Sequence, residues 1–116
     1  MSFVSDFGAA QAALACAYDS IPYDSQPFPD ARPAYLGALG VLHGLQTALP
    51  SNCRVLELGC ASGGHLVPLA WYHPHAEFVG IDLSAAQIRA GRELVAALGL
   101  GNCTLLAGDL SDFEVE

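Results

Sequence analysis

The sequence predicts an α/β protein in which parallel strands alternate with helices. Three short apolar runs, Arg54–Leu58, Glu77–Asp82 and Cys103–Ala107, have the length and composition of buried strands. Longer segments of helical character separate these runs, and right-handed crossovers of this length connect parallel neighbours. Glycines and acids follow the runs, at the edge where open parallel sheets bind ligands. We therefore expect a three-layer protein with helices on both faces of a parallel sheet.

An N-terminal helical region is expected to precede the sheet. The alanine-rich stretch 9–18 predicts a short helix, and three prolines make the following segment, 21–32, a loop. Asp30 is a candidate N-cap of a second helix, which has Pro33 in its first turn. Leucines recur along that helix at helical spacing, so we expect it to end between residues 46 and 50.

The two segments between the strands are expected to form helices at 64–72 and 84–98. Ser84 is a suitable N-cap for the longer helix, because its hydroxyl can accept from a free backbone N–H group. Gly99 or Gly101 suits the end of that helix, since glycine adopts the positive φ of a helix terminator.

The acidic composition argues against nucleic acid as a substrate or partner. The chain has 12 acidic residues against 4 basic ones, all of them arginines, and a formal net charge of −8. Binding to a polyanion normally depends on clustered lysine and arginine side chains. Small molecules or proteins are therefore the expected substrates.

Neither a membrane span nor a metal site is indicated. Residues 33–53 carry no formal charge, but prolines, glycines and polar residues interrupt them, which favours a buried helix and a loop. The four cysteines form no Cys-x-x-Cys pair, and His73 and His75 flank a proline in a loop. No basic residue precedes the apolar stretch 9–17, as it would in a secretory signal, so we expect a cytoplasmic protein with reduced thiols.

The most informative segment follows the first strand, where an acid leads into a glycine-rich turn, Glu57-Leu58-Gly59-Cys60-Ala61-Ser62-Gly63. Glycines allow positive φ and let backbone N–H groups approach a bound molecule, and the next helix directs its positive end at the turn. The second strand ends at Asp82, and Asp109 follows the third. Because the carboxyl ends of parallel strands share one edge, we expect these acids to converge on a ligand site.

The chain resembles the class I S-adenosylmethionine-dependent methyltransferases over residues 54–112. Three motifs occur in the order of that family: the turn above, Phe78-Val79-Gly80-Ile81-Asp82-Leu83-Ser84, and Leu106-Ala107-Gly108-Asp109-Leu110. The segment Tyr23-Asp24-Ser25-Gln26-Pro27-Phe28 is similar to the opening segment of a bacterial branch. The resemblance implies a Rossmann-like fold, S-adenosylmethionine as cofactor and S-adenosylhomocysteine as product. It further implies methyl transfer to an unidentified small molecule or protein.

The resemblance also implies roles for the residues of the turn. The turn that would lie under the methionine part of the cofactor consists of Gly59, Cys60, Ala61 and Gly63. Glu57 would lie near the cationic amino group of the cofactor. A small buried thiol that fills space is the favoured interpretation of Cys60, because the sequence places no base beside it.

The nucleoside part of the cofactor would be held by the later motifs. Asp82 would accept hydrogen bonds from the ribose hydroxyls, and Leu83 would pack against adenine. Asp109, followed by Leu110, would accept a hydrogen bond from the adenine amino group. Two interpretations stay open for Tyr23 and its proline-rich loop: a lid that folds over the cofactor, or a plain surface loop. The catalytic residues are unknown, because an activated sulfonium needs alignment in a dry site more than it needs a base.

Two positions depart from the family pattern. Ala61 stands where many members have glycine, and an alanine fits there if its φ stays negative. His65 stands where an asparagine would be commoner in this branch.

Two other functions stay open. The turn also satisfies Gly59-x-Ala61-x-x-Gly64, a loose form of the dinucleotide fingerprint, so an NAD- or FAD-binding Rossmann protein is one alternative. Glu57 argues against that alternative, since a carboxylate there suits a cationic amine and repels a pyrophosphate. A non-catalytic cofactor-binding or interaction module is the other alternative.

The chain is short for this family, whose complete fold has about seven strands. We divide it into N-terminal helices with a proline-rich cap segment, 1–50, and a cofactor-binding half domain, 51–116, truncated after the third strand. The chain alone is not expected to carry a complete active site. Without a fourth strand the edge of Arg54–Leu58 is open, so we expect self-association, either through this edge or by exchange of the N-terminal helices.

Overall fold

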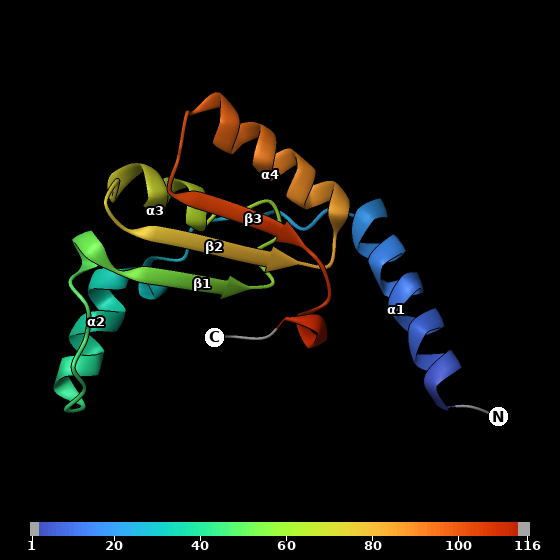
Figure 1. Ribbon diagram of the computed structural model, residues 1–116, viewed down its shortest axis with the longest axis horizontal. Helices are drawn as coiled ribbons and strands as arrows, with labels where there is room; N and C mark the ends of the chain where they lie inside the picture. The colour runs from blue at the N-terminus through green and yellow to red at the C-terminus, as the bar shows by residue number, and fades with distance from the viewer. Residues whose placement is uncertain (1–2, 114–116) are drawn as a thin grey trace.

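The computed structural model of the protein describes residues 3–113, and its centre is a three-stranded parallel sheet (Figure 1). The strands are β1 (Arg54–Leu58), β2 (Glu77–Asp82) and β3 (Cys103–Ala107), in the order β1-β2-β3. All three have the predicted bounds, because each is a short apolar run between turn residues. Both pairs of strands are parallel and their carboxyl ends lie at one edge of the sheet, so the predicted Rossmann-like parallel α/β class is confirmed.

The crossover helices are α3 (Leu66–Tyr72) and α4 (Ala85–Ala97). As predicted, Ser84 caps α4: its hydroxyl oxygen accepts from the Gln87 backbone N–H at 3.2 Å. Gly99 follows the helix with a φ of +65° and ends it. Helix α3 begins two residues later than predicted, because Gly63 still belongs to the turn and has a φ of +79°.

The N-terminal region contains helix α1 (Phe3–Ser20), a loop and helix α2 (Pro33–Leu42). Helix α1 extends the predicted helix in both directions. The prediction that Asp30 caps α2 was wrong: Asp30 lies in a single 3-10 turn, Pro29–Ala31, and the residue before α2 is Arg32, which makes no side-chain cap. The proline at the first position of α2 sets its φ instead, so the helix begins without a capping side chain.

Helix α2 also ends earlier than its leucine spacing predicts. Gly44 adopts a φ of +80°, its N–H donates to the Val41 carbonyl, and the Leu45 N–H donates to the Gly40 carbonyl at 2.9 Å. These two bonds form a Schellman motif, which closes a helix. The terminating glycine therefore outweighs the apolar pattern that continues beyond it.

The hydrophobic core lies between the sheet and the two crossover helices. Gly80 and Leu105 are paired across β2 and β3 and share a face of the sheet. Leu66 of α3 packs over Gly80, and Gly91 of α4 packs over Leu105, so both helices cover this face. On the opposite face Leu56 and Leu58 are 45% and 59% exposed. Residues 3–113 thus supply two of the three predicted layers.

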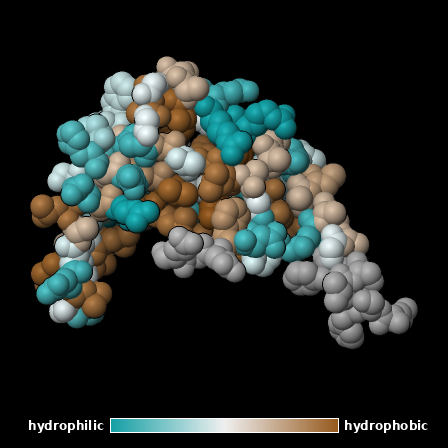
Figure 2. Space-filling model, viewed as in Figure 1, coloured by the Kyte–Doolittle hydropathy of each residue, from teal (hydrophilic) through white to brown (hydrophobic). Residues whose placement is uncertain are grey.

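Helix α2 projects away from the sheet, and none of its side chains is buried (Figure 1). Apolar residues on the surface gather over the strands and over α2 (Figure 2). Among residues 3–113, no helix has both the length and the hydrophobicity that a membrane span requires.

Candidate functional site

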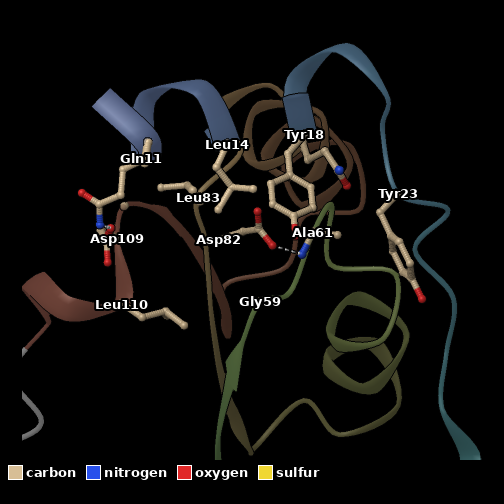
Figure 3. A pocket seen from close by; sticks show the side chains of 13 residues that line it. Gln11, Leu14, Tyr18, Tyr23, Gly59, Ala61, Asp82, Leu83, Asp109 and Leu110 are labelled. Atoms are coloured by element: carbon tan, nitrogen blue, oxygen red, sulfur yellow. Dashed lines mark hydrogen bonds between the residues drawn. The ribbon is translucent and has the colours of Figure 1, made fainter. Parts of the chain in front are cut away.

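A pocket of about 620 Å³ opens at the carboxyl edge of the sheet (Figure 3). It lies between the turn after β1, the ends of β2 and β3, and helix α1. Seven of the ten predicted site residues line it, namely Tyr23, Gly59, Ala61, Asp82, Leu83, Asp109 and Leu110. The remaining lining residues are Ala10, Gln11, Leu14, Tyr18, Gln87 and Gly108.

Asp82 connects two parts of the pocket wall. Its Oδ2 accepts from the Ala61 backbone N–H at 2.8 Å, and its Oδ1 accepts from the Ser84 N–H at 2.9 Å. An ionised carboxylate offers about four acceptor positions, so two remain for a ligand. A vicinal diol presents two donors, which matches the acceptor positions that are left.

The glycine-rich turn has left-handed backbone at three positions. Gly59 and Gly63 have φ values of +77° and +79°, and Ala61 has a φ of +50°. The condition stated for an alanine at this position, a negative φ, is therefore not met. The bond from its N–H to Asp82 stabilises this conformation, which is unfavourable for a residue with a Cβ atom. Among residues 3–113, and apart from Gly59 and its two chain neighbours, no atom lies within 4 Å of the place of a Cβ on Gly59, so this part of the turn is open to a ligand.

Asp109 is largely occupied by neighbours within the chain. Its Oδ1 accepts from the Ser111 N–H at 2.8 Å and from the Ser111 hydroxyl at 2.7 Å. These bonds lower the pKa of Asp109, so its carboxylate is ionised at neutral pH. The amide of Gln11 donates to the other oxygen, Oδ2. An adenine amino group at this place would share Oδ2 with Gln11.

Glu57 lies in β1, two residues before Gly59, and does not line the pocket. Its Oε2 atom is buried and has no hydrogen-bond partner among the described residues. Burial raises the pKa of Glu57; nearby His65 opposes this rise and Asp82 adds to it. A buried acceptor of this kind is completed by a donor, and a cationic amine would satisfy it while favouring the ionised form.

Cys60 and Gly63 form the back of the turn. Burial, with the charges of Asp82 and Glu57, raises the pKa of the Cys60 thiol to about 12. The thiol is therefore protonated at neutral pH, which fits the space-filling role expected for it. A Cβ on Gly63 would lie 3.2 Å from Leu105 and from Val67, so close packing also favours glycine at this position.

Helix α1 contributes a wall of the pocket that was not predicted from the sequence. Gln11, Leu14 and Tyr18 recur at helical spacing and point from α1 toward the pocket (Figure 3). Asp19, at the end of the same helix, accepts from the Ser84 hydroxyl and from the Ala86 N–H at 3.3 Å. This contact fastens α1 to the first turn of α4. The spacing of the three residues was visible in the sequence, but nothing in it indicated which surface they face.

The fold and the pocket define an α/β protein that binds a small ligand at the carboxyl edge of its sheet. Within residues 3–113, no three His, Cys, Asp or Glu side chains come together as a metal site. A family model described as a methyltransferase domain matches residues 49–116. The chain belongs to this methyltransferase-domain family and has the class I, S-adenosylmethionine-dependent fold, of which it holds the N-terminal half.

Individual relatives agree with this assignment. The uncharacterized protein RP789 of Rickettsia prowazekii (strain Madrid E) is 41% identical, and the match covers 84% of this chain and 18% of that protein. The ribosomal RNA small subunit methyltransferase G of Salinibacter ruber is 41% identical over 58% of this chain and 31% of its own length. The structure of PKMT2 from Rickettsia typhi in complex with AdoHcy matches 80% of this chain and 18% of that chain, with a TM-score of 0.74 and 32% identity.

Family membership confirms two predictions, the resemblance and S-adenosylmethionine as the cofactor class. It gives no support to the dinucleotide-binding alternative. The chain spans less than a fifth of the length of RP789 and of PKMT2. The roles of the individual site residues and the division at residue 50 stay predictions.

Proposed function

We propose that this chain forms the cofactor site of an enzyme that transfers a methyl group from S-adenosylmethionine to a small-molecule or protein acceptor. The observation that carries the proposal is the placement of Asp82. Its carboxylate has two free acceptor positions in a pocket that also contains the open surface of Gly59. A related protein, PKMT2, has been solved in complex with AdoHcy, which supports the same ligand class here.

The residues present fit the parts of this cofactor. The buried Oε2 of Glu57, two residues before Gly59, has no partner among the described residues, and a cationic amino group that reached it would complete it. Asp82 has acceptor positions for a ribose, and Leu83 and Leu110 offer apolar surface for adenine. The cofactor supplies a methyl group that its sulfonium has already activated. In this proposal the residues described here bind and orient it.

The proposal is tested by calorimetric titration of the chain with S-adenosylhomocysteine. Asp82→Asn is the matched variant, since it keeps the shape of the side chain but removes its charge and one acceptor. We expect binding by the unchanged chain and an affinity about tenfold weaker in the variant, because hydrogen bonds to a charged group are the stronger ones. NAD is the control ligand. Tight binding of NAD with no binding of S-adenosylhomocysteine would contradict the proposal.

The acceptor is proposed from charge. Several relatives are named RNA methyltransferases, but this chain has a net charge of −8 and only four basic residues. A phosphate backbone would meet general repulsion here, which supports a small-molecule or protein acceptor. Transfer of labelled methyl groups to cell extract, treated with nuclease or with protease, tests this proposal. Label that is lost after nuclease treatment alone would contradict it.

The free edge of β1 supports self-association of the chain. The strand lies at the end of the sheet order and its Leu56 and Leu58 are exposed, so both its backbone and its side chains are available for pairing. Light scattering over a range of concentrations tests this, and a single monomeric species at high concentration would contradict it.

A cytoplasmic location, which the four free cysteines support, is tested by fractionation of cells.

A further inference from the structure

His65 connects the glycine-rich turn to the loop that precedes α2. The ring is buried, with 6% of its surface exposed. Its Nδ1 accepts from the Phe28 backbone N–H at 3.0 Å, and its Nε2 lies 3.4 Å from the Ala31 carbonyl oxygen. The Phe28 ring packs edge-on against the imidazole with centroids 5.8 Å apart. A neutral imidazole supplies the one acceptor and the one donor that this arrangement uses.

A second contact joins the same loop to the neighbouring residue of the turn. The Ser25 hydroxyl accepts from the Gly64 backbone N–H at 2.8 Å. The loop backbone approaches so closely that a Cβ on Gly64 would lie 2.2 Å from the Ser25 carbonyl oxygen. Gly64 lies just before His65, the residue that precedes α3, so Ser25 holds the loop against the end of the turn.

These contacts determine where Tyr23 lies. Asp19 is bonded to the start of α4 and Ser25 to the start of α3, so the five residues between them are anchored at both ends. Tyr23 belongs to this short span and lines the pocket at its rim (Figure 3). Its side chain is 61% exposed, so local packing does little to fix its position. The two anchors do so instead.

We propose that His65, assisted by Ser25, is a positioning residue for cofactor binding: it fastens the Tyr23-bearing loop to the glycine-rich turn, so that loop docking and ligand binding are coupled. The inference rests on the proposed function. If loss of the imidazole contacts leaves the loop docked in a tenth of the molecules, the apparent affinity for the ligand falls tenfold. By reciprocity, the bound ligand stabilises the docked loop.

The test is calorimetric titration with S-adenosylhomocysteine, combined with hydrogen exchange of the loop amides. His65→Leu removes both ring contacts at similar volume, and we expect its affinity to be about tenfold lower. His65→Asn keeps one acceptor and donors, so it is expected to recover most of the affinity. His75→Leu, which replaces an exposed histidine remote from the pocket, is the control and is expected to bind like the unchanged chain.

Hydrogen exchange separates a positioning role from a merely structural one. In the unchanged chain, S-adenosylhomocysteine is expected to slow exchange of the Phe28 amide; in His65→Leu this slowing is lost while the sheet amides stay protected. If His65→Leu does not fold, Ser25→Ala decides, with an expected loss of about threefold in affinity and the same loss of loop protection.

The possible failures are distinguishable. Absence of binding by the unchanged chain would overturn the proposed function and this inference with it. Binding by the unchanged chain that is as tight in His65→Leu, or in Ser25→Ala where that variant decides, would overturn only this inference.

Discussion

The two halves of this molecule are stabilised by different interactions. From Cys53 onward, the sheet and its crossover helices bury a continuous apolar core. In the described part of the N-terminal half, no side chain from residue 8 to residue 52 is buried. That half is attached through polar contacts at Asp19, Ser25 and His65. The pocket lies between the two, so one wall is rigid and the other depends on a few hydrogen bonds. Stability and ligand affinity should therefore respond to different residues.

The largest effect on stability is expected from Gly91→Ala in the packed half. A Cβ there would lie 2.4 Å from the Ser62 carbonyl oxygen and 2.5 Å from Leu105. Overpacking against backbone is expected to cost about 3 kcal/mol of unfolding free energy. Gly101→Ala is the control, because nothing lies within 4 Å of its Cβ position. Urea denaturation measures both variants, and equal midpoints would contradict the close packing of α4 on the turn.

Asp19→Ala tests the attachment of α1 in the other half. The variant loses the contacts to Ser84 and Ala86, so the end of α1 is freed and the bond from Gln11 to Asp109 is left to hold the helix at the pocket. We expect the affinity for S-adenosylhomocysteine to fall about tenfold, while the unfolding free energy falls by only about 1 kcal/mol. Calorimetry and urea denaturation of the same preparation measure the two effects. A loss of stability as large as that of Gly91→Ala would show that the halves are not separate in this sense.

Glu57→Gln, in the packed half, is expected to affect the stability of the chain and its ligand affinity in different ways. Burial raises the pKa of Glu57, so the folded chain binds its proton more tightly than the unfolded chain does. The contribution of the protonated form is present at low pH and is lost as the pH rises through the raised pKa. Relative to the Gln variant, the unchanged chain should therefore lose stability as the pH rises above the ordinary pKa of a glutamate and through the raised pKa of the folded chain.

Glu57→Gln removes the loss of stability at higher pH, but it is expected to weaken ligand binding. Without the carboxylate, the amino group of S-adenosylhomocysteine loses its ionised partner, and affinity should fall about tenfold at neutral pH. Thermal melts across the pH range and titration at neutral pH provide the measurements. Parallel stability curves for the two proteins would exclude a buried ionisable Glu57.

Ala61→Gly tests the left-handed backbone of the turn. At its φ of +50°, a Cβ atom is unfavourable, so the glycine variant should be as stable as the unchanged chain or about 0.5 kcal/mol more stable. Ala90→Gly in helix α4 is the matched control, and it should lose about 1 kcal/mol as glycine does in an ordinary helix. Equal losses in the two variants, measured by urea denaturation, would contradict the positive φ.

The smallest effect is expected at Cys60. Its thiol is buried and its pKa is raised to about 12, so it should resist alkylation by iodoacetamide at neutral pH. Cys16 is exposed and should react. Mass spectrometry of the chain and of Cys16→Ser distinguishes the two sites. Rapid labelling of Cys60 in the folded protein would require a more open turn than the one described.

The amino-acid sequence alone determined the elements whose signals are local. The three strands have the predicted bounds, because each apolar run is delimited by turn residues on both sides. Ser84 caps the start of α4 as predicted, and Gly99, one of the two predicted terminators, ends the helix. Capping depends only on residues within a turn of the helix. Parallel strands then bring Asp82 and Asp109 to one edge, so this part of the pocket also followed from the sequence.

Only the tertiary structure decided what depends on contacts between distant segments. The positive φ of Ala61 is stabilised by the carboxylate of Asp82, and the wall of Gln11, Leu14 and Tyr18 exists because Asp19 meets the start of α4. His65 was noted as unusual, but its partner Phe28 lies 37 residues away. Local propensity and periodicity carry no information on such pairings. The sequence therefore predicted the sheet and the turn, and tertiary packing determined how the N-terminal half completes the site.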